Sequence, residues 1–143
     1  MKTIKTSELS GRALDYAVAL AVGGYELIRV PPDADGENEG VVLAPLNLLS
    51  SGYIFPPKGK LPINFFISRY SGDWAECGPL LERYCIELFI GEDFYRATRT
   101  STDPRDDTDY PTGYGSNYKD AVCRFVVLYR LGDTVEIPEE LLS

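Results

Sequence analysis

The sequence predicts an α+β fold: one domain over residues 1–143, with a small, mainly antiparallel sheet packed against two helices. Three patterns predict it. Apolar residues recur at helical spacing near residues 8–22 and near residues 117–131, and apolar and polar side chains alternate along a hairpin at residues 84–100. A chain of 143 residues buries roughly 70% of the surface that its unfolded form exposes, which is enough for a single core.

The N-terminal part predicts a short strand at residues 2–5 and then the first helix, which two glycines at 23–24 end. Ser7 or Ser10 is a suitable N-cap, because a serine oxygen accepts a hydrogen bond from a free amide at a helix start. A β-rich run at residues 25–30 predicts a further strand. The apolar helix positions are spaced i, i+3, i+4 and i+7, as on one buried face: Leu14, Ala17, Val18 and Ala21.

Three segments favour loops. Residues 31–40 carry four acids and no large apolar side chain, and residues 101–111 are polar, so both are predicted as solvated loops. Residues 50–62 contain three prolines and two glycines, which interrupt regular structure. We interpret this last segment as an ordered excursion, or alternatively as an apolar surface that meets a partner.

The hairpin is the clearest β pattern, and it is predicted as the centre of the sheet. Its turn is Gly-Glu-Asp at residues 91–93, and residues 94–100 form the returning strand. The alternating apolar positions of the first strand are Tyr84, Ile86, Leu88 and Ile90.

The second predicted helix begins after Ser116 or Asn117, either of which is a suitable N-cap, and it ends before Gly132. A short strand at residues 134–137 follows. The apolar positions again follow helical spacing: Val122, Phe125, Val126 and Tyr129.

Charge and composition disfavour several functions. The chain has 14 Lys and Arg against 22 Asp and Glu, a net charge of −8, which opposes contacts with nucleic-acid phosphates. It has no histidine, the commonest general base and zinc ligand, so binding is favoured over catalysis and neither a metal nor a cofactor is expected. The cysteines are too few for a disulfide framework and are predicted as reduced thiols: Cys77, Cys85 and Cys123.

Membrane association is not expected. No apolar run approaches the roughly 18 residues of a membrane-spanning helix. The basic N-terminus is not followed by the apolar stretch of a secretory signal. We therefore expect a cytosolic protein without a membrane partner.

The first candidate site is the stretch 113–119, which leads into the second helix. Its glycines would let the backbone approach a ligand, and a helix start offers free amides and a positive dipole end to a phosphate or carboxylate. The alternative is a capped helix after a glycine turn, since the spacing matches no phosphate-loop motif. The candidate ligand-binding residues are Gly115, Ser116, Asn117, Tyr118 and Lys119.

The second candidate site is the stretch 70–79, which we interpret as a loop that carries the only tryptophan. Tyr70 and Trp74 are suited to stacking on a planar ring, and the Asp73 carboxylate to binding hydroxyls or amines. The alternative is a tryptophan that plugs the core under a turn. Arg83 and Arg99 are candidates for local positive charge, although strand arginines more often pair with acids.

Three blocks of the chain resemble one family. They are residues 5–19, residues 70–83 with their Asp-Trp-Ala and Gly-Pro motifs, and residues 120–127 with 131–141. Together they resemble the NinX-like family of small proteins from tailed bacteriophages and prophages, a family of unknown function. Cys77 stands where that family usually has glycine. The resemblance implies a phage product that acts in the host bacterial cytoplasm.

From these observations we expect a non-enzymatic phage protein that sequesters a small, nucleotide-derived host signal as a counter-defence. The alternative is an acidic inhibitor that binds a host defence or DNA-handling protein. An enzyme that uses Asp73 or Glu76 ranks last. Direct nucleic-acid binding is not expected, and homo-oligomerisation stays open.

Overall fold

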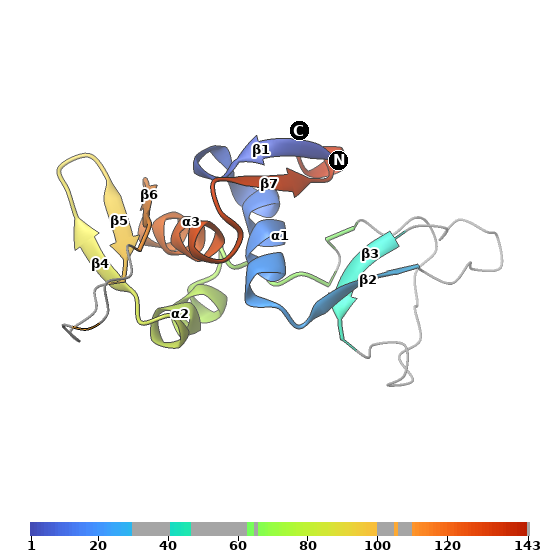
Figure 1. The fold of residues 1–143 in the computed structure, drawn as a ribbon, viewed down its shortest axis with the longest axis horizontal. Coiled ribbons are helices and arrows are strands. Elements are labelled where there is room, and N and C mark those ends of the chain that lie inside the picture. The colour runs from blue at the N-terminus through green and yellow to red at the C-terminus, as the bar shows by residue number, and fades with distance from the viewer. Residues whose placement is uncertain (30–40, 47–62, 65, 100–104, 106–109, 143) are drawn as a thin grey trace. The chain divides into compact units, whose positions relative to one another are not determined.

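The computed structural model describes residues 1–29, 41–46, 63–64, 66–99, 105 and 110–142 (Figure 1). The chain forms two compact units, one of residues 1–22 with 68–143 and one of residues 23–67. Every strand pair in the described part is antiparallel, and helices pack beside the sheets. The predicted α+β class, with small antiparallel sheets, is therefore confirmed.

The smaller unit is built on one hairpin-like strand pair. Strand β2 (Tyr25–Arg29) pairs with β3 (Val41–Pro45), which confirms the strand predicted at 25–30. The Leu43 amide donates to the Ile63 carbonyl at 3.0 Å and so ties the pair to the chain that follows. The predicted segments 31–40 and 50–62 lie outside the described residues. A small apolar cluster packs on the pair: Ile28, Val42, Ala44 and Phe66.

The larger unit has helix α3 (Tyr118–Leu131) at its centre (Figure 1). Helix α1 (Gly11–Val22) packs against α3 and also contacts β7 (Thr134–Ile137). Strands β5 (Tyr95–Thr98) and β6 (Thr112–Gly115) of the three-stranded sheet contact α3 as well. The side chains of Leu14 and Phe125 are fully buried in this core. Both predicted helices are confirmed, but only α3 covers the sheet. α1 contacts α3 and β7 instead.

The two ends of the described chain pair with each other. Strand β1 (Lys2–Lys5) runs antiparallel to β7 (Thr134–Ile137), so both predicted short strands are confirmed. Thr6, at the start of the 3₁₀ turn η1 (Thr6–Glu8), is fully buried, and its hydroxyl donates to the Gly132 carbonyl at 2.7 Å. This bond fixes the start of α1 beside the end of α3.

The predicted hairpin is confirmed as β4 (Glu87–Ile90) and β5 (Tyr95–Thr98), but its first strand is shorter than predicted. Tyr84 is the residue that ends the preceding helix and Ile86 lies before the strand, so their assignment to it is corrected. A third strand, β6 (Thr112–Gly115), adds to β5. The alternative of a capped helix after a glycine turn is therefore only half correct: α3 is capped, but residues 113–115 belong to a strand and not to a turn. The predicted loop at 101–111 lies outside the described residues except for residues 105, 110 and 111.

The glycines of β6 are explained by packing. A Cβ atom on Gly113 would overlap the Ala121 carbonyl oxygen and the Phe125 amide nitrogen of α3. A Cβ on Gly115 would lie 2.7 Å from the Ala121 amide nitrogen. These glycines therefore let the strand backbone touch the helix backbone, which explains them without a ligand.

Helix α2 (Trp74–Arg83) occupies the stretch that the sequence analysis interpreted as a loop. The Asp73 side chain caps it by accepting from the Ala75 amide at 3.0 Å. Gly78 and Pro79 lie inside the helix, where both residue types are unfavourable, and this is why the sequence suggested a loop. Helix α2 packs on α3 through Cys77 and Leu80, which are buried.

A buried carboxylate joins α1 to the segment before α2. Asp15 is only 2% exposed. It accepts hydrogen bonds from the Ser71 amide and hydroxyl, each at 2.7 Å, and pairs with Arg12 at 2.8 Å. Every oxygen of this carboxylate is thus partnered, which is what a buried charge requires.

Candidate functional site

Two segments that lie about forty residues apart in the sequence line one pocket. Its volume is about 260 Å³, and it is open to solvent. Trp74 is the first residue of α2 and Tyr118 is the first residue of α3, so the pocket lies where the N-termini of two helices meet. The lining residues are Trp74, Asn117, Tyr118 and Lys119, and all four were predicted as ligand-binding residues.

Trp74 presents an accessible ring at this pocket. Its side chain is 47% exposed, so the alternative of a tryptophan that plugs the core is wrong. A Cβ on Gly78 would lie 3.6 Å from Trp74 Nε1, which shows that the indole lies along the next turn of its own helix. The ring is therefore supported by α2 and remains partly free for stacking.

The start of α3 supplies the polar part of the pocket. Asn117 is the N-cap, as predicted, and its Oδ1 accepts from the Asp120 amide at 2.9 Å. The amides of Tyr118 and Lys119 precede the first intrahelical bond, and they have no acceptor within the described chain. Two donors and the dipole end of a 14-residue helix thus lie at the pocket.

The remaining walls of the pocket are held by neighbouring rings and by a buried thiol. The Tyr118 ring contacts the Tyr95 ring edge to face, with 4.4 Å between centroids. Cys77 Sγ lies 3.9 Å from the Lys119 carbonyl oxygen, which ties α2 to the first turn of α3. Cys77 and Cys123 share a thiol hydrogen bond that lowers the pKa of Cys77 and raises the pKa of Cys123.

The local charge is mixed. Lys119 adds a positive charge to the lining, and Asp120 follows it in the first turn of α3. The Asp120 carboxylate accepts from Asn117 Nδ2 at 3.3 Å and so stays beside the cap. Because this acid offsets the lysine in part, ring stacking is the stronger component of the site and anion binding the weaker one.

Six of the ten predicted site residues lie outside this pocket, and four of these six are Tyr70, Asp73, Arg83 and Arg99. Tyr70 is only 9% exposed, and Asp73 is engaged as the α2 cap. Arg83 is nine residues from Trp74, or about 14 Å along the helix, and it donates to the Val22 carbonyl at 2.8 Å. The Arg99 guanidinium lies 5.0 Å from the Tyr110 ring centroid. These residues support the fold or contact neighbours, and none of them lines this pocket.

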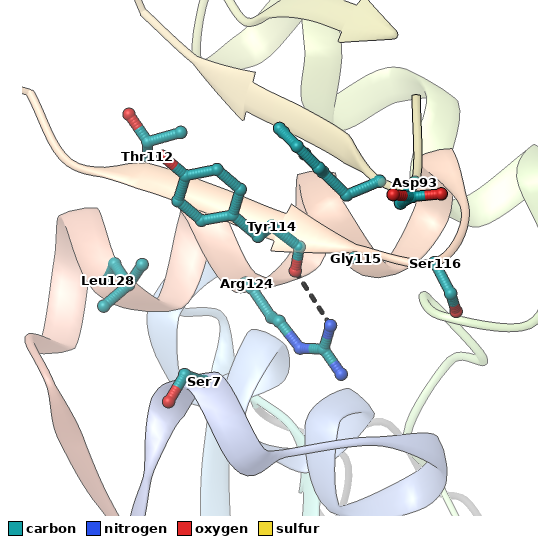
Figure 2. A pocket seen from close by; sticks show the side chains of 9 residues that line it. Ser7, Asp93, Thr112, Tyr114, Gly115, Ser116, Arg124 and Leu128 are labelled. Carbon is teal, nitrogen blue, oxygen red and sulfur yellow. Dashed lines mark hydrogen bonds between the residues drawn. The ribbon is translucent and has the colours of Figure 1, made fainter. Parts of the chain in front are cut away.

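Gly115 and Ser116 line a second pocket, next to the first, with a volume of about 330 Å³ (Figure 2). The other residues of this second pocket include Phe94 and Arg124, which were not predicted as site residues, and Tyr114, which lies in the predicted stretch 113–119 but was not among its candidate ligand-binding residues. Tyr114 lies in strand β6, which was not predicted, and so the exposure of its ring could not be predicted either. The alternation of Tyr114 with two glycines was the only available signal.

The described residues contain neither a metal-ligand cluster nor a helix that could span a membrane. Within them, no three His, Cys, Asp or Glu side chains cluster as metal ligands would. In the same part of the chain, no helix is both long and apolar enough to cross a bilayer.

Comparison with known proteins adds no assignment. No protein-family model matches the chain, and a search of curated proteins finds no match. The resemblance to the NinX-like family therefore stays a prediction.

Proposed function

We propose that this is a non-enzymatic binding protein that takes up a small, ring-bearing anion of the nucleotide class. The observation that carries the proposal is the shared pocket of Trp74, Asn117, Tyr118 and Lys119. An exposed indole, two free amides and a lysine are the groups that bind a base and an acidic substituent together.

The size of the pocket limits the ligand. Its volume of about 260 Å³ lies just below the range of about 300–1,000 Å³ of typical ligand sites. We therefore expect one base or nucleoside moiety to be enclosed, with the rest of the ligand in solvent. Stacking of a base on an aromatic side chain contributes about 1–3 kcal/mol, so a micromolar affinity requires the amide and lysine contacts as well.

Binding is favoured over catalysis by the composition of the pocket. The chain contains no histidine, and the four lining side chains include no carboxylate or thiol. Its reactive side-chain groups are the Tyr118 hydroxyl and the Lys119 amine, and it lacks the histidine or carboxylate base that most often accompanies a hydroxyl nucleophile. The pocket therefore holds mainly groups that recognise a ligand.

The biological setting of the proposal comes from the family resemblance. A NinX-like phage protein in the host bacterial cytoplasm would act by lowering the free concentration of a host nucleotide signal. Sequestration of this kind is a counter-defence function, and it needs tight binding without turnover.

The test uses the single tryptophan as its probe. Titration with adenosine and guanosine monophosphates and with cyclic dinucleotides is expected to change Trp74 fluorescence saturably, because a stacked base alters the indole environment. Lys119→Gln is expected to weaken the phosphorylated ligands about tenfold and to leave nucleosides unaffected. Lys2→Gln, on β1, is the matched control. The proposal fails if no ligand of the panel gives a saturable change.

A further inference from the structure

We infer that the outer edge of β6 is a second binding site, which takes an extended, basic and apolar peptide segment as an added strand. The site consists of the Thr112 amide and carbonyl, the Tyr114 amide, and the second pocket beside them (Figure 2); the Tyr114 carbonyl already accepts a hydrogen bond from Arg124. It is separate from the Trp74 pocket, so the inference does not rest on the proposed function.

The hydrogen-bond register shows which edge of β6 is free. The Gly91 amide donates to the Phe94 carbonyl at 2.8 Å, so these residues form a hydrogen-bonded pair across the hairpin. Bonding direction alternates along a strand, and therefore Tyr95 and Ala97 direct their backbone groups toward β6. Their partners, Gly115 and Gly113, use their backbone groups for β5.

Thr112 and Tyr114 consequently point their backbone groups away from the sheet. The contact that Arg124 makes agrees with this direction, because its Nη1 donates to the Tyr114 carbonyl at 2.8 Å from outside the sheet (Figure 2). Within the described chain, the Tyr114 amide, the Thr112 amide and the Thr112 carbonyl have no hydrogen-bond partner. An unpaired strand edge of this kind is a template for an added strand.

The second pocket offers side-chain contacts along the same edge. Phe94 and Tyr114 are 43% and 53% exposed, and their rings meet edge to face with 5.5 Å between centroids. Leu128 adds an aliphatic wall from α3. Exposed aromatic rings beside a free strand edge favour a polypeptide partner, which supplies main-chain hydrogen bonds and apolar side chains together.

The charges favour a basic segment. The Asp93 carboxylate lines the pocket and has no recorded partner in the described chain. Arg124 directs its guanidinium to two carbonyls, donating to Leu9 at 2.9 and 3.1 Å and to Tyr114. The whole chain carries a net charge of −8, which attracts a cationic peptide and repels a nucleic acid.

The test uses a defined probe, a fluorescent octapeptide of alternating lysine and valine with a central phenylalanine. Two further versions carry N-methyl groups on the amides of one edge or of the other. All three keep the same side chains and charge. Fluorescence anisotropy is expected to show that one N-methylated peptide binds about tenfold more weakly than the parent, while the other binds as the parent does. Equal affinities for all three peptides, or no binding, would overturn the inference.

Variants of the protein locate the site. Tyr114→Pro removes the outward amide without removing a bond to β5, and it is expected to weaken the parent peptide about tenfold. Tyr114→Ala keeps the amide and should lose less affinity. Ile90→Ala, on the opposite edge strand, is the control and should bind normally. If the Tyr114→Pro protein binds the parent peptide as tightly as wild type does, the proposed site is contradicted. If that variant does not fold, the comparison of the N-methylated peptides on wild-type protein still tests the inference.

Two results would assign the edge to another occupant and overturn the inference. One is a concentration-dependent dimer in analytical ultracentrifugation that Tyr114→Pro abolishes, which would give the edge to a second copy of the chain. The other is tighter binding of an oligothymidylate than of the peptide, with the same sensitivity to Tyr114→Pro.

Discussion

Two glycine-to-alanine substitutions are expected to change stability in opposite directions. In Gly113→Ala, the added Cβ would overlap two backbone atoms of α3 and lie 2.9 Å from Phe125 Cα. An ordinary carbon contact is about 3.6 Å, so β6 must move from the helix by at least roughly 0.7 Å. Since backbone atoms cannot rotate away, the cost is expected at the upper end of overpacking, about 3 kcal/mol.

Gly78→Ala is the counterpart within α2. Here the new Cβ would be 3.6 Å from Trp74 Nε1, an ordinary contact, and the position is helical. Replacing a helical glycine with alanine raises the free energy of unfolding by about 0.5–1 kcal/mol when nothing clashes. The same chemical change is thus expected to stabilise one site and to destabilise the other.

Thermal and urea unfolding measure both effects. For a domain of this size, 1 kcal/mol shifts the Tm by about 3 °C, so Gly113→Ala is expected to lower the Tm by about 10 °C and Gly78→Ala to raise it by about 2–3 °C. Gly91→Ala is a useful control, because its Cβ would meet only the Phe94 ring, at 3.0 Å, and a side chain can move. A Gly113→Ala protein as stable as wild type would refute the packing of β6 on α3.

Three other properties are also predicted. Asp15→Ala should lower the free energy of unfolding by about 3 kcal/mol, because it removes the buried acceptor of hydrogen bonds from Ser71 and Arg12. Urea unfolding measures this loss, and a change below about 1 kcal/mol would contradict the prediction. Of the three thiols, only the exposed Cys85 should react rapidly with Ellman's reagent before unfolding, and rapid reaction of Cys77 or Cys123 would contradict their burial. Burial raises the pKa of Tyr16, so the contribution of this residue to stability should be constant up to about pH 10 and should be lost as the pH rises further. Urea unfolding at a series of pH values measures the effect, and Tyr16→Phe should reduce the loss of stability above about pH 10.

Local signals in the sequence predicted much of this fold. The periodic apolar residues of α1 and α3 and the cap at Asn117 each depend on neighbours within one element, so they can be predicted without tertiary structure. The alternation along the hairpin predicted that its strands pair but not which side chains are buried, because Ile90 is 70% exposed. The helix α2 was missed because Gly78 and Pro79 argue against a helix, although Asp73 with Glu76 three residues later resembles a helix start.

Strand β6 could not be predicted from local propensity. Glycine is disfavoured in strands, yet Gly113 and Gly115 are needed because α3 lies directly against the strand backbone. The meeting of Trp74 with Lys119 likewise depends on how α2 packs on α3. The stretches 70–79 and 113–119 were each candidate sites because of their residue types. Only the structure shows that Trp74 and Lys119 line one pocket and that Arg83 and Arg99 lie outside it.

Native mass spectrometry of the protein purified from bacteria tests the central claim most directly. We expect wild-type protein to carry a small-molecule adduct that is released on denaturation and identified as nucleotide-derived, and Trp74→Ala protein to have only the mass of the chain. Retention of the same adduct by the Trp74→Ala protein would place its binding elsewhere. Wild-type protein with the mass of the chain alone, before and after incubation with the nucleotide panel, would contradict the account.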